Sequence, residues 1–291
     1  MTIETGWHDM PELEYHADPC PEPSLSASIA KIVVNKTPLH AWMRHPKHPD
    51  AEPFEATDAM ILGKAVHAQV FGGADLEIIP ADNWRTKAAK EAKAKAIAED
   101  RIPILQTKEE QVYEMAERVR ERFEGLYGGP YHEERVAIWR CPRTGHYRRA
   151  MMDSSAHAAP IIVDLKVTGK AVDEEACIRR VFSDSLDVQS GAYEEAMETL
   201  NPEWIGRVQF YFQWIEDKSP YALSRPILMG EAAMTYGRER WQAAGALWDA
   251  ATTRDHFPSF STEPTEAVPP GWTITQWETR KGLDPLLQGI V

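Results

Sequence analysis

Two carboxylates and a lysine lie close together in the middle of the chain, in segments with the pattern of strands. Asp153 ends the segment HYRRAMMD, and Asp164 and Lys166 lie two residues apart in PIIVDLKV. Because side chains alternate along a strand, Asp164 and Lys166 share one face with Ile162. If the two strands are neighbours, the carboxylates repel each other, and a divalent cation is the usual partner that keeps both ionised.

This arrangement indicates metal-dependent chemistry on a phosphoryl group. Lys166 beside a cation would hold a water molecule or help to deprotonate it, or it would stabilise the charge that grows on phosphoryl oxygens. A surface Asp–Lys ion pair on an edge strand has the same spacing. The residues that accompany the pair therefore decide between the two interpretations.

Two segments with helical spacing could bring further polar groups to this site. Gly63 and His67 lie four residues apart in GKAVHAQVF, so they share a helix face. The small Gly63 would let this helix approach the sheet with His67 directed at it. Gln189 and Tyr193 share a face in VQSGAYEEAM in the same way. A buried core histidine and a buried tyrosine in an ordinary first helical turn are the structural alternatives.

The elements that must position these residues follow from the periodicity of the chain. Up to about residue 125 the pattern is mostly helical, with helices starting at Ser26 or Ser28, at Thr37-Pro38, at Asp58, near residue 84 and at the capping box Thr107–Glu110. The last of these has Val112, Met115, Ala116, Val119 and Phe123 on one face. After residues 128–130 the pattern changes to that of strands.

Three strands are expected after this change, at residues 134–140, 146–153 and 160–167, and they form a meander whose first turn is CPRTG. Helices then alternate with strands: helices at 172–183, 186–200 and 231–253, and strands at 207–215 and 221–229. This order predicts an α/β fold in which helices flank a mixed central sheet.

The domain boundaries follow from the same pattern and from the prolines. One domain is expected over residues 25–260, with a helical N-terminal part (25–127) and a catalytic sheet core (131–253). Residues 1–24 are acidic and contain four prolines, which predicts an extended arm without a helix. Residues 261–291 are expected to form an irregular tail, which Trp272 and Trp277 could dock.

Composition excludes several classes of protein. The 291 residues are 43% hydrophobic, which argues against disorder over most of the chain. Three cysteines make neither a disulfide framework nor a four-thiolate site. No apolar run approaches the ~20 residues of a membrane span, and the N-terminus lacks a signal-peptide pattern. We therefore expect a soluble protein of the cytoplasm with no membrane partner.

The net charge is −13, from 45 acidic and 32 basic side chains, which argues against a protein that coats nucleic acid nonspecifically. The charges are unevenly distributed, however. Residues 1–30 carry six acidic and no basic side chains, whereas residues 135–149 carry five arginines and no acid, and residues 84–95 carry five bases against one acid. A polyanion could therefore bind locally.

The order of these motifs resembles that of the PD-(D/E)XK nuclease superfamily, in which a strand pair presents an acid and then an acid-x-lysine to catalytic magnesium. Asp153 followed by Asp164-Leu165-Lys166 matches that pattern, although Met152 stands where many members have proline. LSASIAKIVVNKTPLHAWM looks like the opening helices of RecE-type exonucleases, GKAVHAQVF like their G-x-x-x-H helix, and VQSGAYEEAM like their Q-x-x-x-Y helix. The resemblance covers residues 24–260.

The resemblance implies a RecE-like exodeoxyribonuclease of phage or prophage origin. Such an enzyme degrades one strand of linear double-stranded DNA in the 5′-to-3′ direction, and leaves a 3′ single-stranded overhang for a single-strand annealing (RecT-like) partner. It would use two Mg²⁺ ions, which Mn²⁺ could replace, ~3.5–4 Å apart. The implied metal ligands are His67, Asp153, Asp164 and the Leu165 carbonyl.

The remaining site residues also follow from the resemblance. Lys166 would orient the attacking water, and Gln189 and Tyr193 would lie beside the active site. Glu134, with Glu133 as the alternative, stands where relatives carry an upstream acid.

Four basic residues are candidates for binding DNA: Arg149, Arg148, Lys90 and Lys93. Arg149 lies four residues before Asp153, on the same strand face, and could contact a phosphate with both nitrogens of its fork.

A protein of charge −13 is repelled by DNA, which conflicts with repeated cutting. A cyclic homo-oligomer of three or four subunits would resolve this conflict, with its acids facing outward and residues 84–95 and 135–149 lining a central channel.

Two alternative functions share these residues. One is another nuclease of the superfamily, an endonuclease or a single-strand-specific enzyme. The other is a catalytically silent DNA-binding or assembly module of the same fold.

Overall fold

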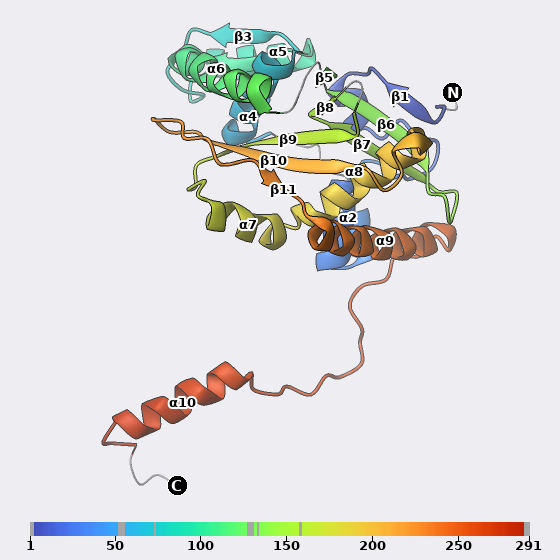
Figure 1. The fold of residues 1–291 in the computed structure, drawn as a ribbon, viewed down its shortest axis with the longest axis vertical. Coiled ribbons are helices and arrows are strands. Elements are labelled where there is room, and N and C mark those ends of the chain that lie inside the picture. The colour runs from blue at the N-terminus through green and yellow to red at the C-terminus, as the bar shows by residue number, and fades with distance from the viewer. Residues whose placement is uncertain are drawn as a thin grey trace. The chain divides into compact units, whose positions relative to one another are not determined.

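The computed structural model describes residues 3–51, 56–72, 74–126, 131–132, 134–156 and 159–287. The chain forms two compact units, Met1–Ser259 and Phe260–Val291. The first unit contains the sheets and nearly all of the helices of the described chain (Figure 1).

A mixed sheet of five strands lies at the centre of the first unit, in the order β11-β10-β9-β8-β5. The strands are β5 (Tyr131–His132), β8 (Ser154–Ala156), β9 (Ile161–Thr168), β10 (Gln209–Glu216) and β11 (Ile227–Leu228). β9 and β10 are parallel over their full length, and the other pairs are antiparallel. The predicted strand at 221–229 is reduced to β11, since Pro226 precedes it and has no N–H for a ladder.

A second sheet has the order β1-β6-β7-β2. It contains β1 (Gly6–His8), β2 (Leu25–Ser26), β6 (Arg135–Arg140) and β7 (Tyr147–Met152). The expected hairpin at 134–153 is present as β6 and β7. The expected meander is wrong in its third member, because the chain passes from β7 through Asp153 into β8, and it is β8 that pairs with β9.

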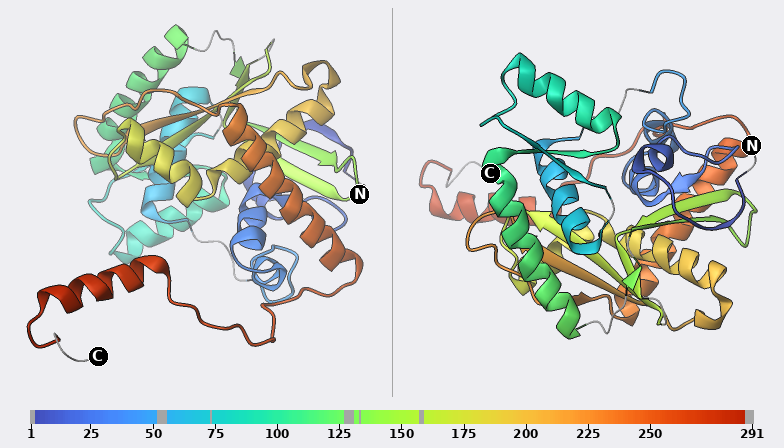
Figure 2. Two further views of the ribbon diagram at one scale, coloured as in Figure 1. Left: turned by 60° about the horizontal axis from the view of Figure 1, so that its bottom comes forward. Right: turned by 90° about the horizontal axis from the view of Figure 1, so that it is seen from above.

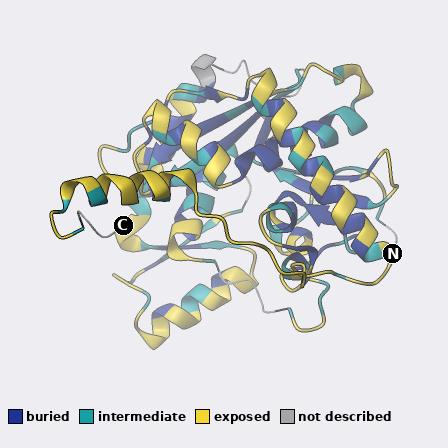
Figure 3. Cartoon of the chain, turned by 90° about the horizontal axis from the view of Figure 1, so that it is seen from below, coloured by how far each residue is buried: buried dark blue, intermediate teal, exposed yellow. Residues whose placement is uncertain are grey.

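Helices cover both faces of the central sheet, as the sequence predicts (Figure 1, Figure 2). On one face, Phe210, Phe212 and Trp214 pack against four helices. These are α2 (Ala27–Asn35), α7 (Glu174–Ser183), α8 (Leu186–Leu200) and α9 (Glu231–Thr253). On the other face, Val163 and Leu165 pack against α4 (Asp58–Phe71) and α6 (Glu109–Leu126). Figure 3 shows that buried residues line the inner sides of these elements.

Local sequence explains most of the helix boundaries. Thr57, Thr86 and Asp173 cap the first turns of α4, α5 (Lys87–Ala98) and α7 through their side chains. The predicted apolar face of α6 is fully buried. Shorter helical elements are α3 (Pro38–Trp42), η1 (Gln106–Lys108) and η2 (Pro202–Trp204). Two strands that the sequence analysis missed, β3 (Leu76–Ile79) and β4 (Ile102–Leu105), flank α5 and pair in parallel.

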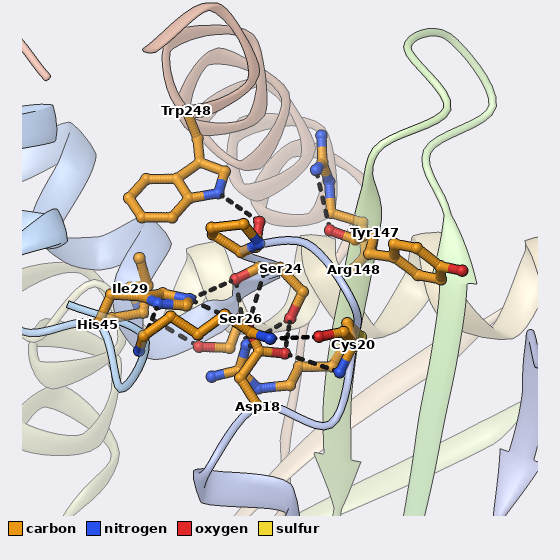
Figure 4. Close-up of polar contacts among 12 residues, drawn as sticks. Asp18, Cys20, Ser24, Ser26, Ile29, His45, Tyr147, Arg148 and Trp248 are labelled. Carbon is orange, nitrogen blue, oxygen red and sulfur yellow. Dashed lines mark hydrogen bonds and ion pairs between the residues drawn. The ribbon is translucent and has the colours of Figure 1, made fainter. Parts of the chain in front are cut away.

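The N-terminal residues do not form the expected extended arm. They contain β1 and a short helix, α1 (Glu12–His16), which begins directly after Pro11. Asp18 is buried and accepts hydrogen bonds from the N–H and hydroxyl of Ser24, and it lies 3.3 Å from His45 Nε2 and 3.2 Å from Arg149 Nη1. Figure 4 shows this cluster below Trp248 of α9. Pairing of Asp18 inside the protein therefore helps to hold this segment in a folded conformation.

The second unit contains α10 (Gly271–Leu283), so the expectation of an irregular tail over 261–291 is wrong for these residues. All of the tail's prolines but one precede this helix, and Pro270 stands at its N-cap, where a missing N–H costs no helical hydrogen bond. None of the helices in the described part of the chain is long and apolar enough to cross a membrane. Docking of the tail by Trp272 and Trp277 stays a prediction.

Candidate active site

The candidate site lies where the two sheets separate. β8 pairs with β9 only through Ser155↔Ile162 and Ser154↔Val163, and at Asp153 the chain turns away into β7. Leu165 of β9 therefore lies beyond the pairing with β8. Its N–H donates to Asp153 Oδ2 at 3.1 Å, and its carbonyl oxygen lies 2.8 Å from His67 Nε2. The side chains of Asp153 and His67 thus bond the backbone N–H and carbonyl groups of Leu165, which a neighbouring strand would otherwise pair.

Helix α4 supplies His67, as expected, and directs it at the sheet. His67 Nδ1 lies 3.6 Å from Asp153 Oδ2, and both side chains are partly exposed, by 24% and 15%. The expectation that Gly63 is needed for α4 to approach the sheet is wrong, however. A Cβ atom at Gly63 would meet only the Cβ of Val167, at 3.9 Å, which is an ordinary contact. The approach of α4 to β9 therefore does not require a glycine.

Asp164 and Lys166 form an ion pair whose carboxylate is buried and whose ammonium group is partly exposed. Asp164 is 1% exposed and Lys166 is 26% exposed, and Lys166 Nζ lies 2.5 Å from Asp164 Oδ1. That oxygen is buried, and the Lys166 ammonium is its partner. The surface ion pair on an edge strand is therefore excluded, because β9 is a central strand and Asp164 is inside.

The charges of this pair follow from their surroundings. Burial raises the pKa of Asp164 to about 6, although the charge of Lys166 opposes this rise. Burial also lowers the pKa of Lys166, but Asp164 and Asp153 outweigh it and hold that pKa above its usual value. The ammonium is therefore charged at neutral pH, which suits orienting water or stabilising an anion better than accepting a proton.

Helix α8 fixes Asp164 through Gln189 and Tyr193. Gln189 Nε2 donates to Asp164 Oδ2 and, at 3.1 Å, to the Tyr193 hydroxyl, which donates to the carbonyl of Met151. Burial raises the pKa of Tyr193 well above its usual range, so it stays a neutral donor. One helix thus ties Asp164 of β9 to the end of β7, beside the fork, the place at Asp153 and Leu165 where the two sheets separate.

Glu134 lies at the end of β6 that faces Asp153, because Arg135 pairs with Met152 across the hairpin. The residue is exposed, yet the protein around its carboxyl group and the charge of Asp153 raise its pKa to about 7. It is therefore near the site, as expected. Glu133 falls outside the described residues.

The prediction that Arg148 and Arg149 bind DNA is wrong, because both are buried and paired within the protein. Arg148 donates to both carboxylate oxygens of Asp249, at 2.8 and 2.6 Å. Arg149 donates to Ser24 and lies beside Asp18. The strand β7 lies between β2 and β6, and these guanidinium groups join it to α9 and to the N-terminal segment. These two arginines of residues 135–149 are therefore not available to line a channel.

Lys90 and Lys93 lie on α5, which follows β3 and precedes β4 in the chain. Lys93 Nζ lies 3.1 Å from Asp58 Oδ1 and 4.9 Å from the centre of the Trp84 ring. Lys90 is exposed. Their contact with DNA stays a prediction.

Two basic residues near the site were missed by the sequence analysis. Lys31 of α2 lies 3.5 Å from Gln189 Oε1, and Arg180 of α7 lies over the ring of Trp214, the β10 residue that pairs with Lys166. Burial and the charge of Lys166 lower the pKa of Lys31 to about 8. A lysine inside the apolar helix IAKIVV was the signal that could have identified the first of these.

The donors at the fork fit a hard divalent cation in their chemistry. They are carboxylate and carbonyl oxygens with one imidazole. Within the described ranges, no three His, Cys, Asp or Glu side chains are arranged around a common point. The groups instead bond to one another in pairs, such as His67 with Leu165. The predicted ligand set stays a prediction.

Comparison with known proteins supports the fold. No model of a protein family and no curated protein sequence matches the chain. Among solved structures, the chain is similar to a crystal structure named "Putative exonuclease" from Eubacterium rectale, with 12% sequence identity and a TM-score of 0.59. The match covers 92% of this chain and 98% of that one. The predicted α/β fold, with a mixed sheet flanked by helices, is confirmed.

Proposed function

We propose that this protein is a Mg²⁺-dependent exodeoxyribonuclease. The observation that supports it most directly is the fork between the sheets, where Asp153, the buried Asp164 and the charged Lys166 meet. A surface role does not explain why an Asp–Lys ion pair is kept on a central strand with its carboxylate buried. Similarity in fold to a structure named as an exonuclease agrees with this proposal.

Each residue of the fork has a role in the proposed reaction. His67, Asp153, Asp164 and the Leu165 carbonyl would hold Mg²⁺. When bound, this ion supplies charge stabilisation and a more acidic water for phosphodiester hydrolysis. Lys166 would orient the water through its ammonium group, and Gln189 and Tyr193 would keep Asp164 in place. Glu134, beside Asp153, would accept a hydrogen bond from water when it is ionised.

The finer assignment rests on the RecE-type order of motifs. We infer degradation of one strand of linear duplex DNA from its 5′ end, a 3′ single-stranded overhang, and a single-strand annealing (RecT-like) partner. We also infer a ring of three or four subunits, since encircled DNA need not be held by many phosphate contacts at a net charge of −13. Arg148 and Arg149, which are paired inside the protein, are no part of this inference.

A digestion with Mg²⁺ tests the function. Linear duplex DNA labelled separately at its 5′ and 3′ ends should lose the 5′ label first, as small products, and closed circular plasmid should remain intact. Cutting of the closed plasmid would instead identify an endonuclease of the same superfamily. Absence of cleavage together with retained DNA binding would identify a catalytically silent module.

A further inference from the structure

An open cavity of about 440 Å³ lies between the start of α4, the loop before α5 and the end of β4. Its lining consists of Trp84, Leu105, Asn83, Asp58, Arg85 and Lys90, none of which belongs to the fork. An indole ring and an aliphatic side chain thus provide apolar walls, and an amide and charged groups provide polar ones. The volume is that of a small-molecule site, which ranges from about 300 to 1,000 Å³.

Trp84 is partly exposed, yet its neighbours hold it in place. Asn83 Oδ1 accepts a hydrogen bond of 2.9 Å from the backbone N–H of Arg85, so this bond closes a turn around Trp84. Lys93 Nζ lies 4.9 Å from the centre of the indole ring, and this cation–π contact orients it. Lys93 itself does not line the cavity. The cavity is therefore bordered by an aromatic ring whose orientation is fixed before any ligand binds.

The cavity is cationic, although the whole chain is acidic. The carboxylate of Asp58 in its lining is paired with Lys93 Nζ, at 3.1 Å. Arg85 and Lys90 are exposed, and neither has an ion pair with another described residue. Two uncompensated cations beside an aromatic ring suit a ligand that is both flat and anionic.

Helix α4 relates the position of this cavity to that of the fork. Asp58 begins the helix and His67 follows nine residues later, which is about 14 Å along the axis at 1.5 Å per residue. A DNA strand advances ~3.4 Å per phosphate in a duplex, so this length corresponds to about four nucleotides. A nucleotide in the cavity would therefore be a different one from the nucleotide that reacts.

We propose that the cavity binds one nucleotide of single-stranded DNA, with its base stacked on Trp84 and its phosphate bound by Arg85 and Lys90. This inference rests on the proposed nuclease function, whose reaction leaves an unpaired strand. Aromatic rings beside cations are the means by which proteins bind single strands without reading their sequence. Duplex DNA suits the cavity less well, because its bases are stacked on one another and offer no free face.

The stacking is tested by binding to the full chain in EDTA, where metal-dependent cleavage cannot occur. Fluorescence anisotropy would compare a labelled oligothymidine with an abasic oligonucleotide of the same length. Trp84→Ala should weaken binding of oligothymidine about ten-fold and leave binding of the abasic strand unchanged, because only the stacked base is lost. Trp84→Phe keeps a ring and should retain most of the affinity.

The cations are tested in the same assay. Arg85→Gln and Lys90→Gln should each weaken binding of both oligonucleotides, since both carry phosphates. Each substitution should also reduce the slope of log affinity against log salt by about 0.7. Arg179→Gln, at an exposed arginine of α7, is the matched control and should bind like the wild type.

Thermal unfolding and cleavage kinetics separate this role from a structural or a catalytic one. The melting temperature shows whether each variant folds. If Trp84→Ala does not fold, Trp84→Leu takes its place, since leucine keeps an apolar side chain but has no ring. In a digestion with Mg²⁺, the folded variant should raise KM about ten-fold and keep kcat within about two-fold, because binding is lost away from the fork.

Failure of the subsite and failure of the nuclease function give different results. A wild-type chain that cleaves DNA while folded Trp84 variants bind oligothymidine equally well would overturn the subsite alone. Equal losses on oligothymidine and on the abasic strand would overturn it too. A wild-type chain that neither binds nor cleaves DNA would overturn the nuclease function and the subsite with it.

Discussion

At the scale of single residues, the ion pair of Asp164 and Lys166 combines two opposing effects. Burial disfavours both charges, while each charge stabilises the other at 2.5 Å. Gln189 adds a hydrogen bond to the second oxygen of Asp164. The pair is therefore held in one geometry, and its exposed end at Lys166 is where a substrate could approach.

Substitution of this pair should remove cleavage and leave the fold intact. Asp164→Asn keeps the shape and the contact with Gln189, and Lys166→Ala removes the ammonium group. We expect each to lower the cleavage rate by about 10²-fold or more, because charge stabilisation is lost in the transition state. The rate of label release measures this, with circular dichroism as the test of folding. Turnover of Lys166→Ala close to that of the wild type would end the mechanism.

The metal requirement should follow the hard oxygen donors at the fork. We expect Mg²⁺ or Mn²⁺ to support cleavage and EDTA to abolish it. Ca²⁺ should bind but support little turnover, because it is larger and less suited to octahedral geometry. Digestion assays with each ion test the turnover, and isothermal titration calorimetry tests the binding. Full activity in EDTA would contradict metal dependence.

At the scale of elements, α8 and α9 cross at two glycines. A Cβ atom on Gly191 of α8 would lie 2.6 Å from the carbonyl oxygen of Gly237 on α9, so the two backbones could not keep this distance. Gly191 lies between Gln189 and Tyr193 on the helix that fixes Asp164. The crossing therefore sets how closely α8 can lie against the site.

Gly191→Ala should destabilise the protein by about 1–3 kcal/mol, because the helices must move apart. Gly63→Ala on α4 is the matched control. Its Cβ would have only the ordinary contact with Val167, and alanine favours a helix by about 0.5–1 kcal/mol over glycine. Urea denaturation measures both changes. Equal stability of the two variants would contradict the close crossing.

The short helix α1 is attached to α4 by an ion pair between Glu12 and Lys64, 2.7 Å apart. Burial alone would raise the pKa of Glu12, but bonds from His16 and Lys64 outweigh it and lower this pKa from 4.5 to about 2. The folded state thus prefers the ionised form more than the unfolded state does. Its contribution to stability is complete above pH 4.5 and is lost as the pH falls towards 2.

Lys64→Met should therefore lower the free energy of unfolding by about 1 kcal/mol at pH 7, a value reduced by the partial exposure of the pair. The difference from the wild type should shrink between pH 4.5 and pH 2. Thermal unfolding across this range measures it, with Lys218→Met, an exposed lysine, as the control. A difference that does not change with pH would show that packing, not charge, accounts for the loss.

At the scale of the whole molecule, the net charge of −13 and the internal pairing of Arg148 and Arg149 count against tight binding of DNA by a single subunit. Assembly into a ring remains the proposal that resolves this. The units Met1–Ser259 and Phe260–Val291 are each compact by themselves, so they can be tested separately for a role in assembly.

Light scattering at micromolar concentration should return a mass of three or four 32.9 kDa subunits for the full chain. A chain ending at Ser259 should keep the melting temperature of the full chain, because the sheets and their cores lie within residues 1–259. Its mass would show whether the second unit contributes to assembly. A single subunit mass for the full chain, with and without DNA, would contradict the ring.

Local pattern in the sequence was sufficient for most elements and for the residues of the fork. Helical spacing placed His67 on a face towards the sheet and Gln189 and Tyr193 on one face of α8, and strand alternation placed Asp164 with Lys166. These predictions depend on neighbours within a few positions, where backbone geometry alone determines which side chains share a face. The capping residues of α2, α3, α5 and α7 are local in the same sense.

Only the tertiary structure decided which charges are available. Arg148, Arg149 and Asp18 look like surface charges in the sequence. In the structure, Arg148 bonds Asp249, Arg149 bonds Ser24, and Asp18 pairs with Arg149, and each of these partners is about 100 or more residues away. The passage of the chain from β7 into β8 and the approach of Lys31 to Gln189 are equally non-local. Pairing across such distances depends on how sheets and helices pack, so the spacing of residues along the chain does not reveal it.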